Sequence, residues 1–312
     1  MTKTISIGDA LMTGFELIRR RPLDVWVWGA LTASPLLLFF WMILNMVGAI
    51  PLAEMAGDTP DPQFLLAFAR VQALSGLVNI LQLVVYVVVV GAVCRAVLKP
   101  DAPRGRFFGL KIGMDEARVA VTLVAIVVAF YAAAFLIVLL AFAFGALLWM
   151  ASEAAAVGLG IVAGLAGLVA VVWLGLRACL IIPASVALDD FAFVQGWSLT
   201  RGHVAHLLGL AAATVAVVIL VQILVMAAAV IVALGLGLAF WPHIQAWGDA
   251  IDGGAALAIN WPLAIGASLL VFPFAAAFYG AMTAISTAPY AAACGQLLAA
   301  KGEDAPSDRE VS

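Results

Sequence analysis

Six long stretches of this chain contain no Asp, Glu, Lys or Arg. They cover residues 25–53, 71–94, 119–152, 154–176, 202–248 and 253–300. Each is at least as long as the roughly 20 apolar residues that a helix needs to cross a bilayer. Backbone groups in hydrocarbon must bond within their own segment, and the apolar residues do not alternate with polar ones as in a membrane barrel. The pattern therefore predicts transmembrane helices.

The two longest stretches each contain a Trp-Pro pair, Trp241-Pro242 and Trp261-Pro262. Tryptophan is enriched where a membrane meets water, so we expect each pair to mark a water-facing break beside one span. The sequence thus predicts an all-α integral membrane fold with six transmembrane helices. These helices form a single domain over residues 1–300, followed by a polar cytoplasmic tail over 301–312.

Composition and charge agree with this fold and add an orientation. The 312 residues are 66% hydrophobic and 11% charged, and a mean hydropathy of +1.16 excludes a water-soluble globular domain. In the six-helix arrangement, all Lys and Arg residues fall on one side of the membrane except Arg70. The positive-inside rule then places both termini in the cytoplasm. We expect a multi-pass protein of the bacterial cytoplasmic (inner) membrane.

Three amphipathic segments on the cytoplasmic side precede the odd-numbered spans. They are GFELIRRRPLDVWVWGAL (14–31), RFFGLKIGMDEARVAVTLV (106–124) and GWSLTRGHVAHLLGLAA (196–212). This spacing predicts three repeats, residues 1–100, 101–188 and 189–300, each with an interfacial helix and a helical hairpin. The residues expected at lipid headgroups are Arg19, Arg20, Arg21, Arg106, Trp197, Arg201 and His203.

The third segment gathers polar side chains in a chain that is otherwise apolar. On a helix that lies along the membrane surface, Trp197 and Leu199 are expected to face lipid. Arg201 and His203 are expected to face water or headgroups, where the planar Arg201 guanidinium suits a lipid phosphate. The interfacial interpretation therefore accounts for this cluster without a chemical reaction.

Two alternatives would give this region chemistry. His203 and His206 are three residues apart and could ligate a metal together with Asp189 and Asp190. No third ligand has a recognisable spacing, so neither a metal nor another cofactor is predicted. The second alternative is acid–base pairs, namely Asp115-Glu116 with Arg118 and Asp189-Asp190 with Arg201. We expect solvated or salt-bridged helix ends instead, and no catalytic residues, because the sequence indicates no pocket.

Polar residues within the spans form two stripes at helical spacing. The stripes are Ser75, Asn79, Gln82 and Tyr86, and Tyr279, Thr283, Ser286 and Tyr290. Such stripes should face the protein interior, where they bond across helices or line a wet cavity. No Asp, Glu, Lys or Arg lies in the middle of a span, which argues against coupled ion transport.

Two further groups of residues have structural interpretations. Gly160 and Gly164 form a GxxxG pair, which favours close helix packing rather than nucleotide binding. Cys94, Cys179 and Cys294 fall toward the cytoplasmic, reducing side, where disulfides are rare.

The block FAFVQGWSLTRGHVAHLLG (191–209) resembles a motif of a bacterial membrane protein family, and GLKIGMDEARVA (109–120) is similar to a second block. The family is related to the membrane domain that is fused to glycerophosphoryl diester phosphodiesterases. The resemblance implies a six-helix membrane fold without the catalytic domain, because the His-Arg-Gly and Glu-Asn-Thr segments of that domain are absent here.

The sequence favours a non-enzymatic, polytopic inner-membrane protein that interacts with lipids, organises the membrane or scaffolds a partner. Its expected partners are membrane lipids, together with a protein partner or a second copy of the chain, and not nucleic acid. One alternative is a permease or lipid transporter with a cavity lined by the two polar stripes. A weaker alternative is a membrane-embedded lipid enzyme.

The charge asymmetry gives a testable topology. Both termini and the segments 96–118 and 184–206 should be cytoplasmic, because they hold nearly all of the Lys and Arg residues. A cysteine placed at Arg104 should therefore react with a membrane-impermeant reagent only after the cytoplasmic side is opened. Labelling from the periplasmic side would contradict this orientation.

Overall fold

A computed structural model gives the fold. It describes residues 6–49, 62–100, 108–110, 113–149, 152–239, 241, 245, 248–249 and 261–303. Within these ranges the chain is helical and contains no strand, so the predicted all-α class is confirmed. The helices are α1 (Ile7–Arg20), α2 (Pro22–Ala49), α4 (Pro62–Leu98), α5 (Met114–Trp149), α6 (Glu153–Ala178), α7 (Ile181–Leu188), α8 (Phe193–Leu199), α9 (Val204–Ala239) and α11 (Trp261–Glu303).

The prediction of six membrane-crossing helices is also confirmed by length and composition. Among the described residues, the segments long and apolar enough are Pro22–Asn45, Phe68–Leu98, Met114–Leu147, Glu153–Leu188, Val204–Val232 and Ala264–Lys301. This architecture is that of a multi-pass membrane protein. Helix α11 extends to Glu303, slightly into the segment predicted as a tail, and residues 304–312 and Arg106 lie outside the described part of the chain.

The chain divides into two compact units. The first unit comprises Met1–Leu17, Val90–Thr214 and Ile285–Ser312, and the second comprises Ile18–Val89 and Val215–Ala284. Helices α1, α4, α9 and α11 contribute residues to both units. Neither unit coincides with one of the three predicted repeats.

Short helices precede the odd-numbered spans in two of the three predicted places. Helix α1 precedes α2, and α8 precedes α9. Before α5, the described residues 108–110 and 113 form turns and a bend, and Phe108 and Gly109 both have positive φ. The described part of this linker thus contains no helix, and the threefold repeat stays a prediction.

An apolar core holds the first unit together. Its fully buried members include Leu180 of α7, Leu207 and Leu210 of α9, and Ala293 of α11. Helix α1 joins them through Ala10, because one face of this amphipathic helix is buried. The core thereby fixes α7, α8 and the beginning of α9 against the end of α6.

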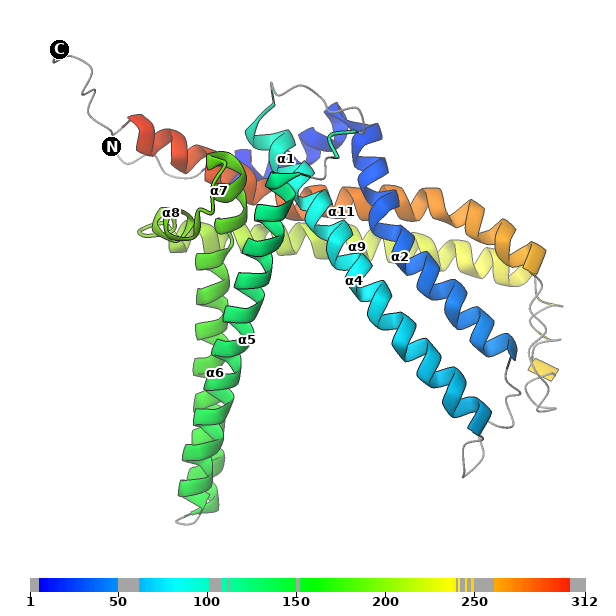
Figure 1. Cartoon of the computed structure of the whole chain (residues 1–312), viewed down its shortest axis with the longest axis horizontal. Coiled ribbons are helices and arrows are strands. Elements are labelled where there is room, and N and C mark those ends of the chain that lie inside the picture. The colour runs from blue at the N-terminus through cyan, green and yellow to red at the C-terminus, as the bar shows by residue number, and fades with distance from the viewer. Residues whose placement is uncertain are drawn as a thin grey trace. The chain divides into compact units, whose positions relative to one another are not determined.

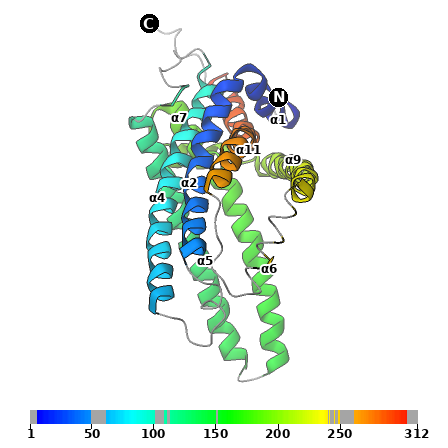
Figure 2. The same ribbon diagram turned by 90° about the vertical axis from the view of Figure 1, so that its right-hand side faces the viewer.

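Helices α5 and α6 of the first unit run side by side as an antiparallel pair (Figures 1 and 2). The expectation of tight packing at Gly160 and Gly164 is wrong, because a Cβ at either residue would meet no atom within 4 Å. The close approach occurs at Gly167, where a Cβ would lie 2.9 Å from Ile137 Cγ2. Gly160 and Gly164 instead line a hollow between the two helices.

The second unit contains a crossing of α2 and α11 at backbone distance. A Cβ at Gly29 would overlap the carbonyl oxygen of Ala276, and a Cβ at Gly280 would overlap that of Val25. Trp26 adds a bond from its Nε1 to the Pro273 carbonyl oxygen at 3.1 Å. Apolar side chains gain nothing by leaving lipid for each other, so close packing of this kind is what joins membrane helices.

Replacing Gly29 by Ala should therefore destabilise the protein by about 1–3 kcal/mol, because the methyl group has no space beside a backbone oxygen. The free energy of unfolding in mixed detergent micelles measures the change. Gly76→Ala in α4 is the matched control, since a Cβ there meets nothing within 4 Å. Equal stabilities of the two variants would show that the crossing is looser than described.

Candidate functional site

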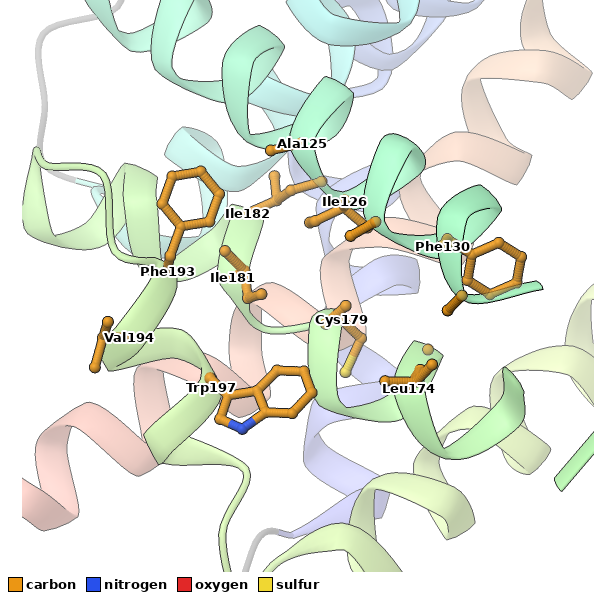
Figure 3. A pocket seen from close by; sticks show the side chains of 14 residues that line it. Ala125, Ile126, Phe130, Leu174, Cys179, Ile181, Ile182, Phe193, Val194 and Trp197 are labelled. Carbon is orange, nitrogen blue, oxygen red and sulfur yellow. The ribbon is translucent and has the colours of Figure 1, made fainter. Parts of the chain in front are cut away.

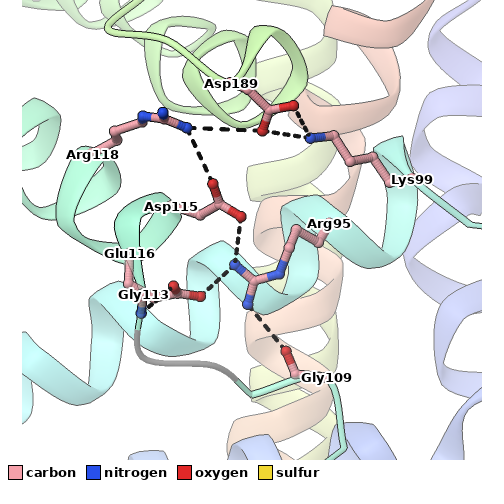
Figure 4. Close-up of polar contacts among 8 residues, drawn as sticks. All are labelled: Arg95, Lys99, Gly109, Gly113, Asp115, Glu116, Arg118 and Asp189. Atoms are coloured by element: carbon pink, nitrogen blue, oxygen red, sulfur yellow. Dashed lines mark hydrogen bonds and ion pairs between the residues drawn. The ribbon is translucent and has the colours of Figure 1, made fainter. Parts of the chain in front are cut away.

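A cluster of charged side chains joins the end of α4 to the beginning of α5 and the end of α7 (Figure 4). At its centre the Arg95 guanidinium forms an ion pair with the Glu116 carboxylate. Both side chains are largely buried, with exposed fractions of 13% and 6%. Asp115 lies farther from Arg95, at 3.9 Å. An ion pair this buried is costly to break, because the partner left behind keeps an uncompensated charge.

Each member of the central pair also fixes backbone. The Glu116 carboxylate accepts a hydrogen bond from the Gly113 amide at 3.0 Å. It thereby caps the first turn of α5, whose opening N–H groups have no partner within the helix. Arg95 Nη2 donates to the Gly109 carbonyl oxygen at 3.1 Å. The pair thus sets both the position of the 108–110 turn and the first residue of α5.

Asp189 closes the cluster from α7. It ends that helix in the left-handed conformation, with a φ of 54°. Lys99 Nζ donates to its two carboxylate oxygens at 2.7 and 2.8 Å, and Arg118 Nη1 lies 3.9 Å from it. The considered pairing of Asp189 with Arg201 is not found. The expectation of salt-bridged helix ends is confirmed for Asp115, Glu116 and Asp189, with Arg95 and Lys99 as unforeseen partners.

An apolar cavity of about 680 Å³ lies between α5, α6, α7 and α8 (Figure 3). Helix α5 contributes Ile126 and Phe130 to its wall, α6 contributes Leu174, and Cys179 follows directly after α6. Phe193, Val194 and Trp197 of α8 face the same space. The volume is within the usual range of small-molecule sites, roughly 300–1,000 Å³. With walls of this kind, the cavity suits an apolar occupant.

The packing of α8 creates this cavity. A Cβ at Gly196 would lie 2.7 Å from Ile181 Cα, so α8 crosses α7 at close range. Ser185 Oγ accepts from the Ala192 amide at 3.4 Å and holds the turn between the two helices. Leu199 is buried in the core, so the expectation that it faces lipid is wrong. Helix α8 therefore uses one face for the core and another for the cavity.

Arg177 lies beside the cavity between two tryptophans. Its Cζ is 4.9 Å from the centroid of the Trp173 ring and 5.2 Å from that of Trp197. The two rings meet edge to face, with centroids 6.0 Å apart. A cation over tryptophan faces is held by the ring quadrupoles. Trp197, expected only as an interfacial anchor, thus also walls the cavity and positions a cation.

The histidine pair shows no metal geometry. The rings of His203 and His206 are 6.4 Å apart, and His203 Nδ1 lies 3.2 Å from the Arg201 carbonyl oxygen. Among the residues that the structure describes, no three His, Cys, Asp or Glu side chains are placed to hold a metal ion. Arg201 is exposed and His203 is half-buried, as a contact with headgroups would require.

The other predicted headgroup residues lie at the junction of α1 and α2. Arg19 and Arg20, in the last turn of α1, are exposed, and Arg21 between the two helices is half-buried.

Neither polar stripe is buried along its whole length. Asn79, Tyr86 and Ser286 are exposed, whereas Ser75, Gln82, Tyr279, Thr283 and Tyr290 are half-buried. The Ser75 hydroxyl donates to the Gln72 carbonyl oxygen and the Thr283 hydroxyl to that of Tyr279, both at 2.8 Å. Both of these bonds lie within a single helix. The stripes consequently do not mark the site.

Comparison with known proteins adds no assignment: no family model, no curated protein and no solved structure matches the chain. The chemistry of the ion-pair cluster and of the cavity therefore indicates which of the two is the better candidate for a binding site. Carboxylates of the ion-pair cluster are bonded to cations, so the cluster is built to hold helices together. The cavity is open and apolar, so it is the better candidate for binding.

The cluster leads to a test of stability. Glu116→Gln should lower the free energy of unfolding by about 3 kcal/mol, because it leaves the buried Arg95 guanidinium without its main countercharge. Asp189→Asn is the control and should cost no more than about 1 kcal/mol, since Asp189 is 58% exposed and exposed ion pairs contribute little. Equal losses in a chemical unfolding experiment would contradict the central role of Glu116.

Proposed function

We propose that the protein is a non-enzymatic, lipid-interacting protein of the bacterial inner membrane that holds a lipid acyl chain in the cavity between α5 and α8. Both termini lie in the cytoplasm in this proposal, as the positive-inside rule indicates. Its kinship with the membrane domain fused to glycerophosphoryl diester phosphodiesterases is part of the same proposal and rests on the block at residues 191–209.

The observation that carries the proposal is the cavity itself. Its wall combines aliphatic and aromatic side chains, such as Ile126, Phe130 and Phe193, with the small residues Gly175 and Ala178. Small residues leave volume for a flexible chain, while the larger ones supply contact area for dispersion. In a membrane, the most abundant flexible apolar group is the acyl chain of a lipid.

Charge distribution within the first unit supports an interfacial place for this cavity. Glu153 in the first turn and Arg177 in the last turn are the charged residues of α6. At a rise of 1.5 Å per residue, these two residues are separated by about 36 Å along the helix. A hydrocarbon core of about 30 Å fits between them. Arg177 then lies at headgroup depth, and the cavity extends from there toward the hydrocarbon core.

Neither rival function gains support from the described residues. A membrane enzyme would need a reactive group near its substrate, yet the carboxylates of Asp115, Glu116 and Asp189 are engaged in the ion-pair cluster. A permease of the predicted kind would need a cavity lined by the polar stripes, whereas the cavity described above is lined by residues of α5 to α8 and by no stripe residue. Lipid binding requires only the apolar volume that is present.

Filling the cavity tests the proposal. Gly175 lines it, and a Cβ at this position meets nothing within 4 Å, so Gly175→Leu should place its side chain in the space. The purified full-length variant should retain fewer lipid molecules than the parent protein in native mass spectrometry. Gly158→Leu, on the same helix and equally unobstructed, should retain as many as the parent. Unchanged retention by Gly175→Leu would contradict the proposed site.

A further inference from the structure

We propose that the cavity selects an anionic phospholipid, whose phosphate is bound by Arg177 while one acyl chain lies along the groove between α5 and α6. This inference rests on the proposed function, because it names the lipid class that the same cavity would take. It adds a recognition element for the headgroup and a path for the chain.

Arg177 differs from the cations of the ion-pair cluster because it has no acidic partner among the described residues. Arg95, Lys99 and Arg118 are each paired with a carboxylate, whereas no described Asp or Glu pairs with Arg177. Its Nε is buried without a hydrogen-bond partner, although the side chain as a whole is only half-buried. A guanidinium in this state gains from an external anion, and its planar donors match the geometry of a phosphate.

The two tryptophans hold the guanidinium in place. Trp173 and Trp197 interact with Arg177 through their ring faces, which orients the group without neutralising its charge. An oriented side chain loses less conformational entropy on binding than a free one. Trp197 also lines the cavity, so the cation and the apolar space share a wall.

The path of the acyl chain follows from the lining of two adjacent hollows. The cavity ends at Ala133 and Leu174, and a second apolar hollow of about 430 Å³ begins at Ala134 and Val171. Residues three or four apart share a helix face, so Val171 and Leu174 continue one groove along α6.

The length of this groove matches one leaflet. From Ala178 in the cavity to Gly167 in the second hollow, α6 rises by about 16 Å. Half of a hydrocarbon core of about 30 Å is nearly the same distance. An acyl chain that starts beside Arg177 therefore reaches the bilayer midplane near Gly167.

The unpaired Arg177 guanidinium should favour an anionic lipid over a zwitterionic one. A zwitterionic headgroup carries its own ammonium group, which competes with Arg177 for the phosphate. A headgroup without that cation leaves the phosphate to the guanidinium, and hydrogen bonds between two charged groups are the stronger ones.

Headgroup selectivity is measured with phosphatidylglycerol and phosphatidylcholine of identical acyl chains, added to the full-length protein in detergent and followed by native mass spectrometry. We expect the parent protein to prefer phosphatidylglycerol. Arg177→Gln should lower this preference about tenfold, which corresponds to about 1.4 kcal/mol. Lys301→Gln, which removes the same charge from an exposed residue of α11, should keep it.

The outcomes separate the two proposals. If Gly175→Leu loses both lipids while Arg177→Gln keeps the preference for phosphatidylglycerol, the role of Arg177 is overturned and the lipid site stands. If Gly175→Leu retains both lipids, the cavity is not the site, and both proposals fail. Circular dichroism and a single gel-filtration peak establish that each variant is folded, so a loss of preference reports on binding.

Discussion

The buried ion pair between Arg95 and Glu116 is the constraint on which the first unit depends. It ties the last turn of α4 to the first turn of α5, and the same Glu116 carboxylate caps that turn. Helix α5 in turn forms a wall of the cavity and packs along α6 and α7. A charge placed at a helix end therefore acts on a binding surface formed farther along the same helix. Polar contacts are expected to fix helix positions in a membrane protein, because apolar contacts between helices provide little net driving force there.

Elements whose cause is local could be predicted from the sequence. Long uncharged stretches determine helices because hydrocarbon permits no other backbone structure for a single span. The predicted class and the number of membrane-crossing helices consequently agree with the structure. Amphipathic segments before α2 and α9 could be recognised in the same way, whereas residues 108–110 form a turn that the pattern of apolar residues does not distinguish from a helix.

Features that depend on which helices meet could not be predicted. The carboxylate of Glu116 was recognised, but its partner Arg95 lies on another helix, and one sequence gives no register between them. The cavity was missed because it exists only when α8 folds across α7, a geometry set by Gly196 against Ile181. A signal did exist for the Arg177 site, since Trp173 and Arg177 are four residues apart on one helix and must be neighbours. The expectation of close packing at Gly160 and Gly164 is wrong because small residues permit close packing but can equally line empty space.

The contact at Gly29 and Gly280 has a consequence for the lengths of α2 and α11. A second contact joins the same two helices, because the rings of Trp41 and Trp261 stack with centroids 5.4 Å apart. A residue inserted between Gly29 and Trp41 would rotate everything beyond it by about 100° around the helix axis, since 3.6 residues make one turn. The indole would then point away from its partner while the glycine crossing held its place. Two fixed points on one pair of helices thus make their register intolerant of insertion or deletion.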